Sequence, residues 1–286
     1  MHTTYMNPQL IFWRTLLCQY NWPGMTERDE RIHSFGSDCT PAQLLTPRLL
    51  LRPFCEADIP ELVPLINDFR VTGRLGRVPF PYSKADAEFF LRQVCPSVDN
   101  VTLAITCRTS RALMGCVSLH GLVAEPRRMG EIGYWIAFMY WGKGFATEAA
   151  TGLLRFAFSE SSPLALDVVR GAHFVDNPNS GRVQQKLGFV YDAQETASLK
   201  DGGESSLPRM ACLARGGKEF ATRTLWLTRE QFARRQQEMM DIMAAREPEN
   251  CSQTSHPPPK AEGTGLGRTN DPSPTTTLDE GPTDAK

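Results

Sequence analysis

One stretch, Gly130 to Phe158, constrains the fold more than any other part of the chain, because it joins a strand, a glycine turn and a helix. Residues Glu131 to Ala137 are rich in aromatic and β-branched side chains, which favours a strand. Two glycines, Gly142 and Gly144, then indicate a tight turn. The following apolar residues recur with the spacing of an amphipathic helix, at positions 146, 149, 150, 153, 154 and 157.

The end of this turn has the properties of an anion site. Glycine allows backbone conformations that other residues avoid, and the first amides of a helix have no acceptor within the helix. The helix dipole adds about half a positive charge at the same end. Phosphate groups bind at such helix ends, so the turn is predicted to bind a phosphate-bearing ligand.

The composition is that of a globular protein without a strong charge. Apolar residues make up 41% of the 286 residues, charged residues make up 22%, and the formal net charge is −1. This balance gives no reason to expect a nucleic acid or a membrane as a partner. The eight cysteines form no CxxC pair and the five histidines no cluster, so no metal site is expected. Thiols of this kind, with no membrane-length apolar run, predict a cytoplasmic protein.

Changes in composition divide the chain into four segments. Residues 1–42 mix aromatic residues, charges and prolines without periodicity, and we interpret them as an arm of uncertain order. Residues 43–232 are predicted to form one domain, to which a helix at 228–246 is appended. From residue 247 onward proline, glycine, threonine and aspartate dominate, so residues 247–286 are predicted to be a disordered tail.

Within the domain, the patterns predict the order β–α–α–β–β–β–α–β–α–β–β and therefore an α+β fold. Pro60 suits a first helical turn, Pro64 predicts a kink or a break in the same helix, and Ser83 and Thr228 are predicted N-caps. Residues 194–220 are predicted to be a long loop. Outside the stretch described above, the predicted strands are 48–53, 101–107, 112–120, 164–175, 189–191 and 221–227, and the predicted helices are 57–69, 83–94 and 178–187.

Two sequence blocks, YWGKGFATEAATGLLRFAF at 140–158 and DNPNSGRVQQKLGF at 176–189, resemble the GNAT superfamily of acyl-CoA-dependent N-acetyltransferases. TPRLLLRPFCEADI at 46–59 and EIGYWI at 131–136 are similar to its RimJ/RimL-type branch. The resemblance covers residues 45–230. It implies a GNAT fold, in which helices flank a mixed, mostly antiparallel central sheet. The strand at 131–137 and the next strand would splay apart in this sheet.

The resemblance also implies acetyl-CoA as co-substrate. Its pyrophosphate would bind the turn, and its pantetheine arm would pair with exposed backbone between the splayed strands. The family signature has Gln or Arg at the position of Trp141, whereas Gly144 and Ala146 match it. The implied cofactor-binding residues are Ile136, Ala137, Phe138, Gly142, Lys143, Gly144, Phe145, Ala146, Thr147 and Asn177, and the resemblance implies no metal.

Direct transfer to an amine needs a base for the amine and an acid for the departing thiolate. By the resemblance, Glu131 would be a carboxylate that acts through water, and Ser180 would be the acid. Many family members carry a tyrosine acid where this chain has Gln184, which cannot act as an acid. As alternatives, Glu131 is a charged residue at the start of a strand, and Ser180 acts only through water. Tyr134 and Tyr140 are interpreted as packing aromatics.

The implied function is acetyl transfer from acetyl-CoA to a primary amine, either a protein N-terminus or a small-molecule amine. The first two helices and the loop at 194–220 are expected to build the acceptor cleft, and such loops vary freely on one fold. Two alternatives stay open. One is a catalytically degenerate module that binds acyl-CoA as a sensor or scaffold. In the other, residues 1–42 and 247–286 are protein-interaction elements. The protein is expected to be a monomer or a homodimer.

Overall fold

The computed structural model describes residues 39–76, 78–124, 127–192, 212–214 and 218–246. The chain forms two compact units, Met1–Ile242 and Met243–Lys286. Of the second unit, only residues 243–246 are described, and they belong to a helix. The expected tail at 247–286 and nearly all of the expected arm at 1–42 lie outside the described residues. The four-segment division of the chain therefore stays a prediction.

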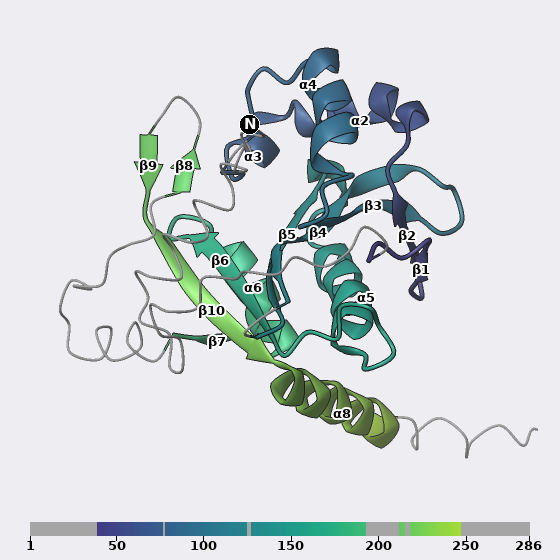
Figure 1. Cartoon of the computed structure of the whole chain (residues 1–286), viewed down its shortest axis with the longest axis vertical. Helices are drawn as coiled ribbons and strands as arrows, with labels where there is room; N and C mark the ends of the chain where they lie inside the picture. The colour runs from purple at the N-terminus through teal and green to yellow at the C-terminus, as the bar shows by residue number, and fades with distance from the viewer. Residues whose placement is uncertain (1–38, 77, 125–126, 193–211, 215–217, 247–286) are drawn as a thin grey trace, which may run out of the picture. The chain divides into compact units, whose positions relative to one another are not determined.

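In the described residues, an eight-stranded sheet runs through the first unit (Figure 1). Its order is β1-β2-β3-β4-β5-β6-β10-β7, and every neighbouring pair is antiparallel except β5 and β6, which are parallel. The predicted α+β class with a mostly antiparallel sheet is confirmed. The strands of this sheet are β1 (Leu44–Leu45), β2 (Leu49–Pro53), β3 (Val101–Cys107), β4 (Leu113–Val123), β5 (Met129–Ile136), β6 (Val168–Phe174), β7 (Val190–Tyr191) and β10 (Thr222–Thr228).

A second, two-stranded sheet lies inside the predicted long loop. β8 (Cys212–Ala214) pairs antiparallel with β9 (Lys218–Phe220). The prediction of a loop without strands is therefore wrong at these positions, because a hairpin of three-residue strands has no periodicity that a sequence window can detect. The remaining residues of that segment lie outside the part of the chain that the structure describes.

Most predicted helices are present, but the helix predicted at 57–69 is shorter in the structure, where α2 covers Ile59–Ile66. Pro60 lies in the first turn of α2, as predicted, and Pro64 lies inside the helix without breaking it. A proline removes one intrahelical hydrogen bond, whereas Ile59, Leu62 and Ile66 of this helix are buried and hold it in place. The helices are α2 (Ile59–Ile66), α3 (Phe69–Thr72), α4 (Lys84–Phe89), α5 (Phe145–Phe158), α6 (Pro178–Leu187) and α8 (Arg229–Arg246), with shorter helical segments η1 (Glu56–Asp58), η2 (Phe90–Val94) and η3 (Phe138–Tyr140).

Two predicted N-caps are confirmed by their hydrogen bonds. The Ser83 hydroxyl accepts from the Asp86 N–H at 3.3 Å, and the Asp86 carboxylate accepts from the Ser83 N–H at 2.8 Å. At the start of α8, the Thr228 hydroxyl accepts from the Gln231 N–H at 3.2 Å and the Gln231 side chain accepts from the Thr228 N–H at 2.8 Å. Both helices begin with reciprocal capping boxes.

The sheet separates two apolar cores, because successive side chains of a strand point to opposite faces. Leu103 and Ile105 on β3 belong to the core that contains α5 and the end of α6. Ala104, which lies between them, belongs to the core beneath α2 and α4. We call the first side the α5–α6 face and the second the α2–α4 face.

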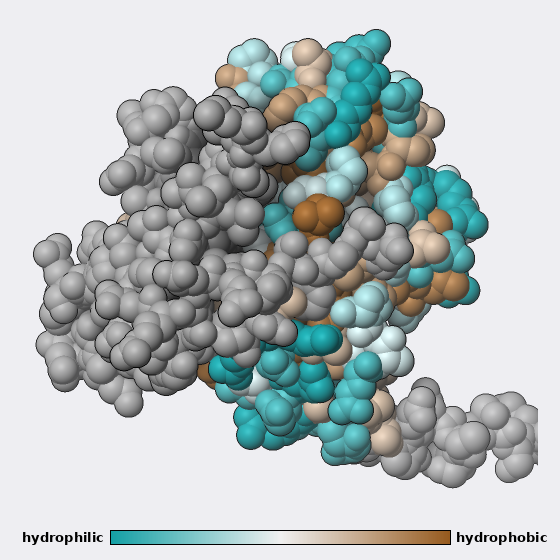
Figure 2. Space-filling view, viewed as in Figure 1, coloured by the Kyte–Doolittle hydropathy of each residue, from teal (hydrophilic) through white to brown (hydrophobic). Residues whose placement is uncertain are grey.

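The described surface carries no large apolar region in the view of Figure 2, where hydrophobic residues lie in separate patches among hydrophilic ones. Among the described residues, none of the helices has the length and apolar character needed to span a membrane.

Candidate active site

The parallel strands β5 and β6 pair over only part of their length. Met129–Ile132 pairs with Val168–Gly171, whereas Gly133–Ile136 pairs with β4 alone. The Ala137 N–H donates to the Met114 carbonyl on the β4 side at 2.8 Å. Because backbone groups alternate in direction along a strand, those of Tyr134 and Ile136 face the gap that opens beside β6. The predicted splay is present at this point of the sheet.

Part of the predicted pantetheine edge is already bonded within the protein. The Ile136 carbonyl accepts a hydrogen bond from the indole N–H of Trp141 at 2.6 Å, and the Ala137 N–H is used by β4. The groups that face the gap are therefore the Ile136 N–H and both backbone groups of Tyr134. The structure thus places the available edge one to two residues earlier than the predicted segment Ile136 to Phe138.

The predicted phosphate turn is adjacent to this gap in the chain. Gly142 and Gly144 have φ values of 75° and 80°, in the left-handed region that favours glycine. Gly144 is the N-cap residue of α5 and offers no side chain as a cap. The amides of Phe145, Ala146 and Thr147 accordingly have no acceptor in the described residues. A Cβ at Gly142 would meet no atom within 4 Å, so the turn is open on that side.

Lys143, which was predicted to contact phosphate, points its ammonium group back along the chain. Its Nζ donates to the Met139 carbonyl at 3.3 Å and lies 5.9 Å from the centre of the Tyr140 ring. The side chain is exposed and flexible, so a bound phosphate would need it to turn toward the free amides of α5.

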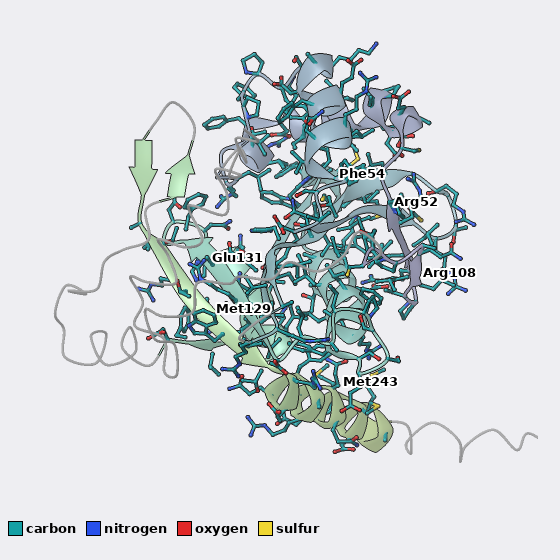
Figure 3. The ribbon with its side chains drawn as sticks, in the orientation of Figure 1. Arg52, Phe54, Arg108, Met129, Glu131 and Met243 are labelled. Carbon is teal, nitrogen blue, oxygen red and sulfur yellow. The ribbon has the colours of Figure 1, made fainter. Side chains whose placement is uncertain are left out.

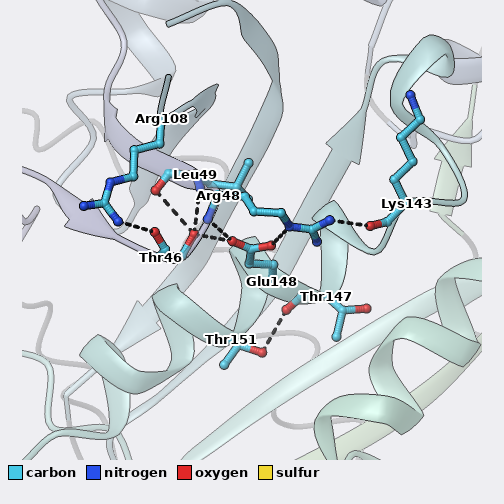
Figure 4. A network of polar contacts seen from close by, with 8 residues as sticks. All are labelled: Thr46, Arg48, Leu49, Arg108, Lys143, Thr147, Glu148 and Thr151. Atoms are coloured by element: carbon cyan, nitrogen blue, oxygen red, sulfur yellow. Dashed lines mark hydrogen bonds and ion pairs between the residues drawn. The ribbon is translucent and has the colours of Figure 1, made fainter. Parts of the chain in front are cut away.

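Arg48, for which the sequence patterns indicated no role, reaches the turn from the position just before β2 (Figure 4). Its Nη1 donates to the Lys143 carbonyl at 3.1 Å, and its Nε pairs with Glu148 Oε2 at 2.6 Å. The Thr46 hydroxyl donates to Glu148 Oε1 at 2.7 Å. This network ties the first turn of α5 to the segment before β2. No local pattern could have indicated it, since its partners are 100 residues apart.

Glu148 is ionised in this network. Partial burial raises the pKa of its carboxyl group. Hydrogen bonds from Thr46 and from the backbone and side chain of Arg48 lower this pKa by more than burial raises it, so the net pKa lies below its ordinary value. The negative charge is thus compensated by Arg48 and does not weaken the positive end of α5.

Asn177 was predicted to contact pantetheine. It is the N-cap residue of α6, but its side chain makes no capping hydrogen bond. Instead, its Oδ1 accepts from Nη1 of Arg74 at 3.3 Å. The Arg74 guanidinium also lies 5.7 Å from the centre of the Trp141 ring. Arg74 therefore links the α6 side of the gap to the turn after β5.

Ser180 meets a tyrosine that was interpreted as a packing residue. The Tyr134 hydroxyl crosses from β5 to α6 and lies 3.0 Å from both the carbonyl and the hydroxyl oxygen of Ser180. Burial raises the pKa of Tyr134, side-chain hydrogen bonds with Ser180 and Gln184 lower it by less, and the net value is about 12. This hydroxyl pair lies on the α5–α6 face of the gap. The alternating pattern of the strand could have shown that Tyr134 faces the helices.

Gln184 occupies the family tyrosine position on the same face. It is 1% exposed, and its Nε2 donates to the Ala172 carbonyl at 3.1 Å. Its Oε1 is buried without a hydrogen-bond partner. An unpaired buried oxygen is costly, and this one lies 3.1 Å from the point that a Cβ on Gly171 would occupy, at the last β5–β6 pair.

Glu131 lies on the opposite, α2–α4 face, beside β6 (Figure 3). One carboxylate oxygen bonds to the guanidinium of Arg170 and the other lies 3.3 Å from Nε2 of His120. Arg170 is 2% exposed and also donates to the Thr224 hydroxyl at 3.3 Å. Glu131 lies on β5, and Ser180 of α6 lies beside Tyr134 of the same strand. The two predicted catalytic residues are therefore near the same part of β5, but on different faces of the sheet. His120 was not singled out by sequence.

The described residues offer neither a thiol nucleophile nor a metal centre at this gap. Complete burial raises the pKa of Cys116 well above its ordinary value, so its sulfur stays protonated and unreactive. No group of three or more His, Cys, Asp or Glu side chains that could hold a metal ion occurs among them.

Comparisons with known proteins agree with this geometry. A family model described as "Acetyltransferase (GNAT) domain" matches residues 48–190, which is half of the chain. YdaF of Bacillus subtilis (strain 168), named as a ribosomal N-acetyltransferase, is 38% identical over 91 residues, which cover 32% of this chain and 45% of YdaF. The chain thus spans less than half the length of this curated relative. Its name agrees with the RimJ/RimL-type branch.

Two solved structures share the fold. A GNAT-family acetyltransferase from Bacillus anthracis has a TM-score of 0.53 at 20% identity and covers 66% of this chain and 99% of its own. A spermidine N-acetyltransferase from Vibrio cholerae, solved with CoA and spermine, has a TM-score of 0.50 at 18% identity. The match covers 65% of this chain and 98% of that structure's chain. The matched domain, the splayed sheet and the shared fold together show that the chain belongs to the GNAT acetyltransferase family.

Proposed function

We propose that this protein transfers an acetyl group from acetyl-CoA to a primary amine. One observation carries the proposal: β5 leaves β6 just before a glycine turn and a helix whose first three amides are free. A ligand with phosphates at one end and an amide-containing arm can use both features at once.

The residues present fit acetyl-CoA. The free amides of Phe145, Ala146 and Thr147 suit the pyrophosphate, and the open side of Gly142 leaves room for it. Backbone groups of Tyr134 and Ile136 suit the amides of pantetheine. The Vibrio cholerae neighbour, which is solved with CoA, supports this assignment. Acetyl-CoA supplies the thioester whose acyl carbon the amine attacks.

Ser180 acts together with Tyr134 on the sulfur side of the reaction. A proton transfer from a hydroxyl of pKa about 12 to a thiolate whose thiol has an ordinary pKa of about 8.5 is uphill by roughly 5 kcal/mol. The pair therefore acts by donating a hydrogen bond to the departing sulfur, which stabilises the charge that develops there, rather than by giving up a proton. Glu131 serves the amine side, on the other face of the sheet.

The acceptor is a primary amine of one of two classes. The name of YdaF points to a ribosomal protein, and the spermine of the Vibrio cholerae structure points to a small polyamine. Thiol release from acetyl-CoA, measured with a peptide that begins with serine, with spermine and with free lysine, tests the activity and separates the classes. We expect amine-dependent release with at least one of them.

A second candidate function is a module that binds acyl-CoA without turnover. Gln184 favours it, because a side-chain amide stands where the family has a tyrosine acid. Tight binding of CoA in calorimetry, together with no amine-dependent thiol release across the panel, would support this module and exclude the enzyme.

A further inference from the structure

We propose that His120 accepts the proton of the acceptor amine and that Glu131 positions it, an inference that rests on the proposed acetyl transfer. His120 lies on β4 directly opposite Glu131 of β5. Both side chains lie on the α2–α4 face, on which Gly133 also lies, two residues beyond Glu131. Gly133 is the first β5 residue beyond the last β5–β6 pair. The imidazole thus lies where the gap opens.

The contact with Glu131 determines which nitrogen of His120 is basic. A carboxylate oxygen only accepts hydrogen bonds, so Nε2, at 3.3 Å from Glu131 Oε1, carries the proton and donates it. The lone pair then belongs to Nδ1, which has no hydrogen-bond partner among the described residues. Nδ1 and Cε1 lie 3.5 Å and 3.1 Å from the point that a Cβ on Gly133 would occupy. The basic nitrogen therefore lies beside Gly133, the β5 residue at which the gap starts.

Glu131 is poorly suited to take the proton itself. Its second oxygen bonds to Arg170, whose guanidinium is buried, and a neighbouring cation favours the ionised carboxylate. Arg170 is in turn bonded to Thr224 on β10. The carboxylate is thereby held in place and orients the imidazole, as a second residue does in catalytic dyads.

The groups that act on the sulfur and those that act on the amine lie on opposite faces of the sheet. Helices α5 and α6 cover the face that carries Tyr134 and Ser180. The imidazole of His120 is 37% exposed on the opposite face, so the amine can approach it there. The charged groups that face the imidazole are Glu131 from β5 and, behind it, Arg170 from β6, while Ser118 of its own strand does not titrate.

The proposed step is balanced. The amine nitrogen forms a bond to the acyl carbon, and the carbon–sulfur bond breaks. The amine proton passes to Nδ1 of His120, and the sulfur leaves with the electron pair of the broken bond. It accepts a hydrogen bond from the Tyr134–Ser180 pair. His120 then returns its proton to solvent, and the sulfur is protonated from solvent.

The test compares His120→Gln with Glu131→Gln in the full chain, using acetyl-CoA and whichever of the serine peptide, spermine or lysine the unaltered protein acetylates. Glutamine keeps an N–H donor for Glu131 but has no basic nitrogen. We expect His120→Gln to lower kcat/KM for the amine about 100-fold or more and to remove the acidic limb of its pH profile, with an unchanged Kd for acetyl-CoA. Glu131→Gln should cause a smaller loss and keep that limb.

Imidazole rescue separates a base from a structural histidine. Added imidazole should restore turnover of His120→Ala but leave Ser180→Ala unaffected. If His120→Gln does not fold, this comparison still tests whether His120 is the base. A full rate and an unchanged acidic limb in His120→Gln, or a failure of rescue, would overturn the assignment while the acetyl transfer stands. If the unaltered protein releases no thiol with any amine of the panel, the transfer itself fails, and the assignment fails with it.

Discussion

The indole N–H of Trp141 donates to the backbone carbonyl of Ile136 at 2.6 Å. The bond joins the residue that departs from the family signature to the last residue of β5. It holds the chain where the strand turns toward Gly142 and Gly144, and it leaves the Ile136 N–H and the Tyr134 backbone as the edge that faces the gap.

Replacement of Trp141 by phenylalanine should weaken both the fold and the site. The ring is kept, but the buried Ile136 carbonyl loses its donor, at a cost of about 1 kcal/mol, so thermal unfolding should shift down by roughly 2–4 °C. The Kd for acetyl-CoA should rise about 5-fold, because the end of β5 is no longer held. Trp226→Phe is the control: it removes the indole bond to Asp192, so it should lower stability alone. Equal Kd values for both variants would contradict this role of Trp141.

A charge at Gly144 should prevent binding at the turn. Gly144→Ala and Gly144→Glu share the backbone strain of a residue with φ of 80°, but only glutamate places a negative charge at the free amides of α5. We expect the Kd for CoA, measured by calorimetry, to be about 10-fold higher or more for the glutamate variant than for the alanine variant. If the two variants bind CoA equally, the pyrophosphate lies elsewhere.

The hydroxyl pair of Tyr134 and Ser180 should behave as one unit. Tyr134→Phe and Ser180→Ala should each lower kcat about 10-fold or more, with little change in the Kd for acetyl-CoA, since the bond to sulfur strengthens only as charge develops. The double variant should be no slower than the slower single one. Tyr140→Phe, which alters a tyrosine on η3, should keep the full rate. Additive losses in the double variant would show that the two hydroxyls act separately.

The contribution of Glu148 to stability should depend on pH. Its folded-state pKa lies below the ordinary value of 4.5, so its ionised form stabilises the fold above that pH, and this contribution is lost as the pH falls through the folded-state value. Urea unfolding should show the unaltered protein more stable than Glu148→Gln at neutral pH, with the difference shrinking below pH 4.5. Glu160→Gln, at an exposed carboxylate, should show no such trend. A difference that is constant down to acid pH would contradict the Arg48–Glu148 network.

Local patterns are sufficient to predict most elements of this chain and the glycine turn at 142–144. The strand, glycine turn and helix of residues 130–158 could be predicted because period-two and 3.6-residue patterns and positive-φ glycines are local properties. The capping boxes at Ser83 and Thr228 depend on residues three apart, and they too were predictable. A kink or a break was predicted at Pro64, and the helix does not break there because its buried neighbours hold it.

The division of the candidate site between the two faces of the sheet depends on contacts between distant segments. Arg48 reaches Glu148, Arg74 reaches Asn177, and Tyr134 reaches Ser180, all across long stretches of chain. The register of β4 against β5 sets His120 opposite Glu131, and the register of β5 against β6 sets Arg170 on the other side of Glu131. Sequence patterns report the period of one element at a time, whereas register and the packing of helices on opposite faces of a sheet depend on contacts between elements.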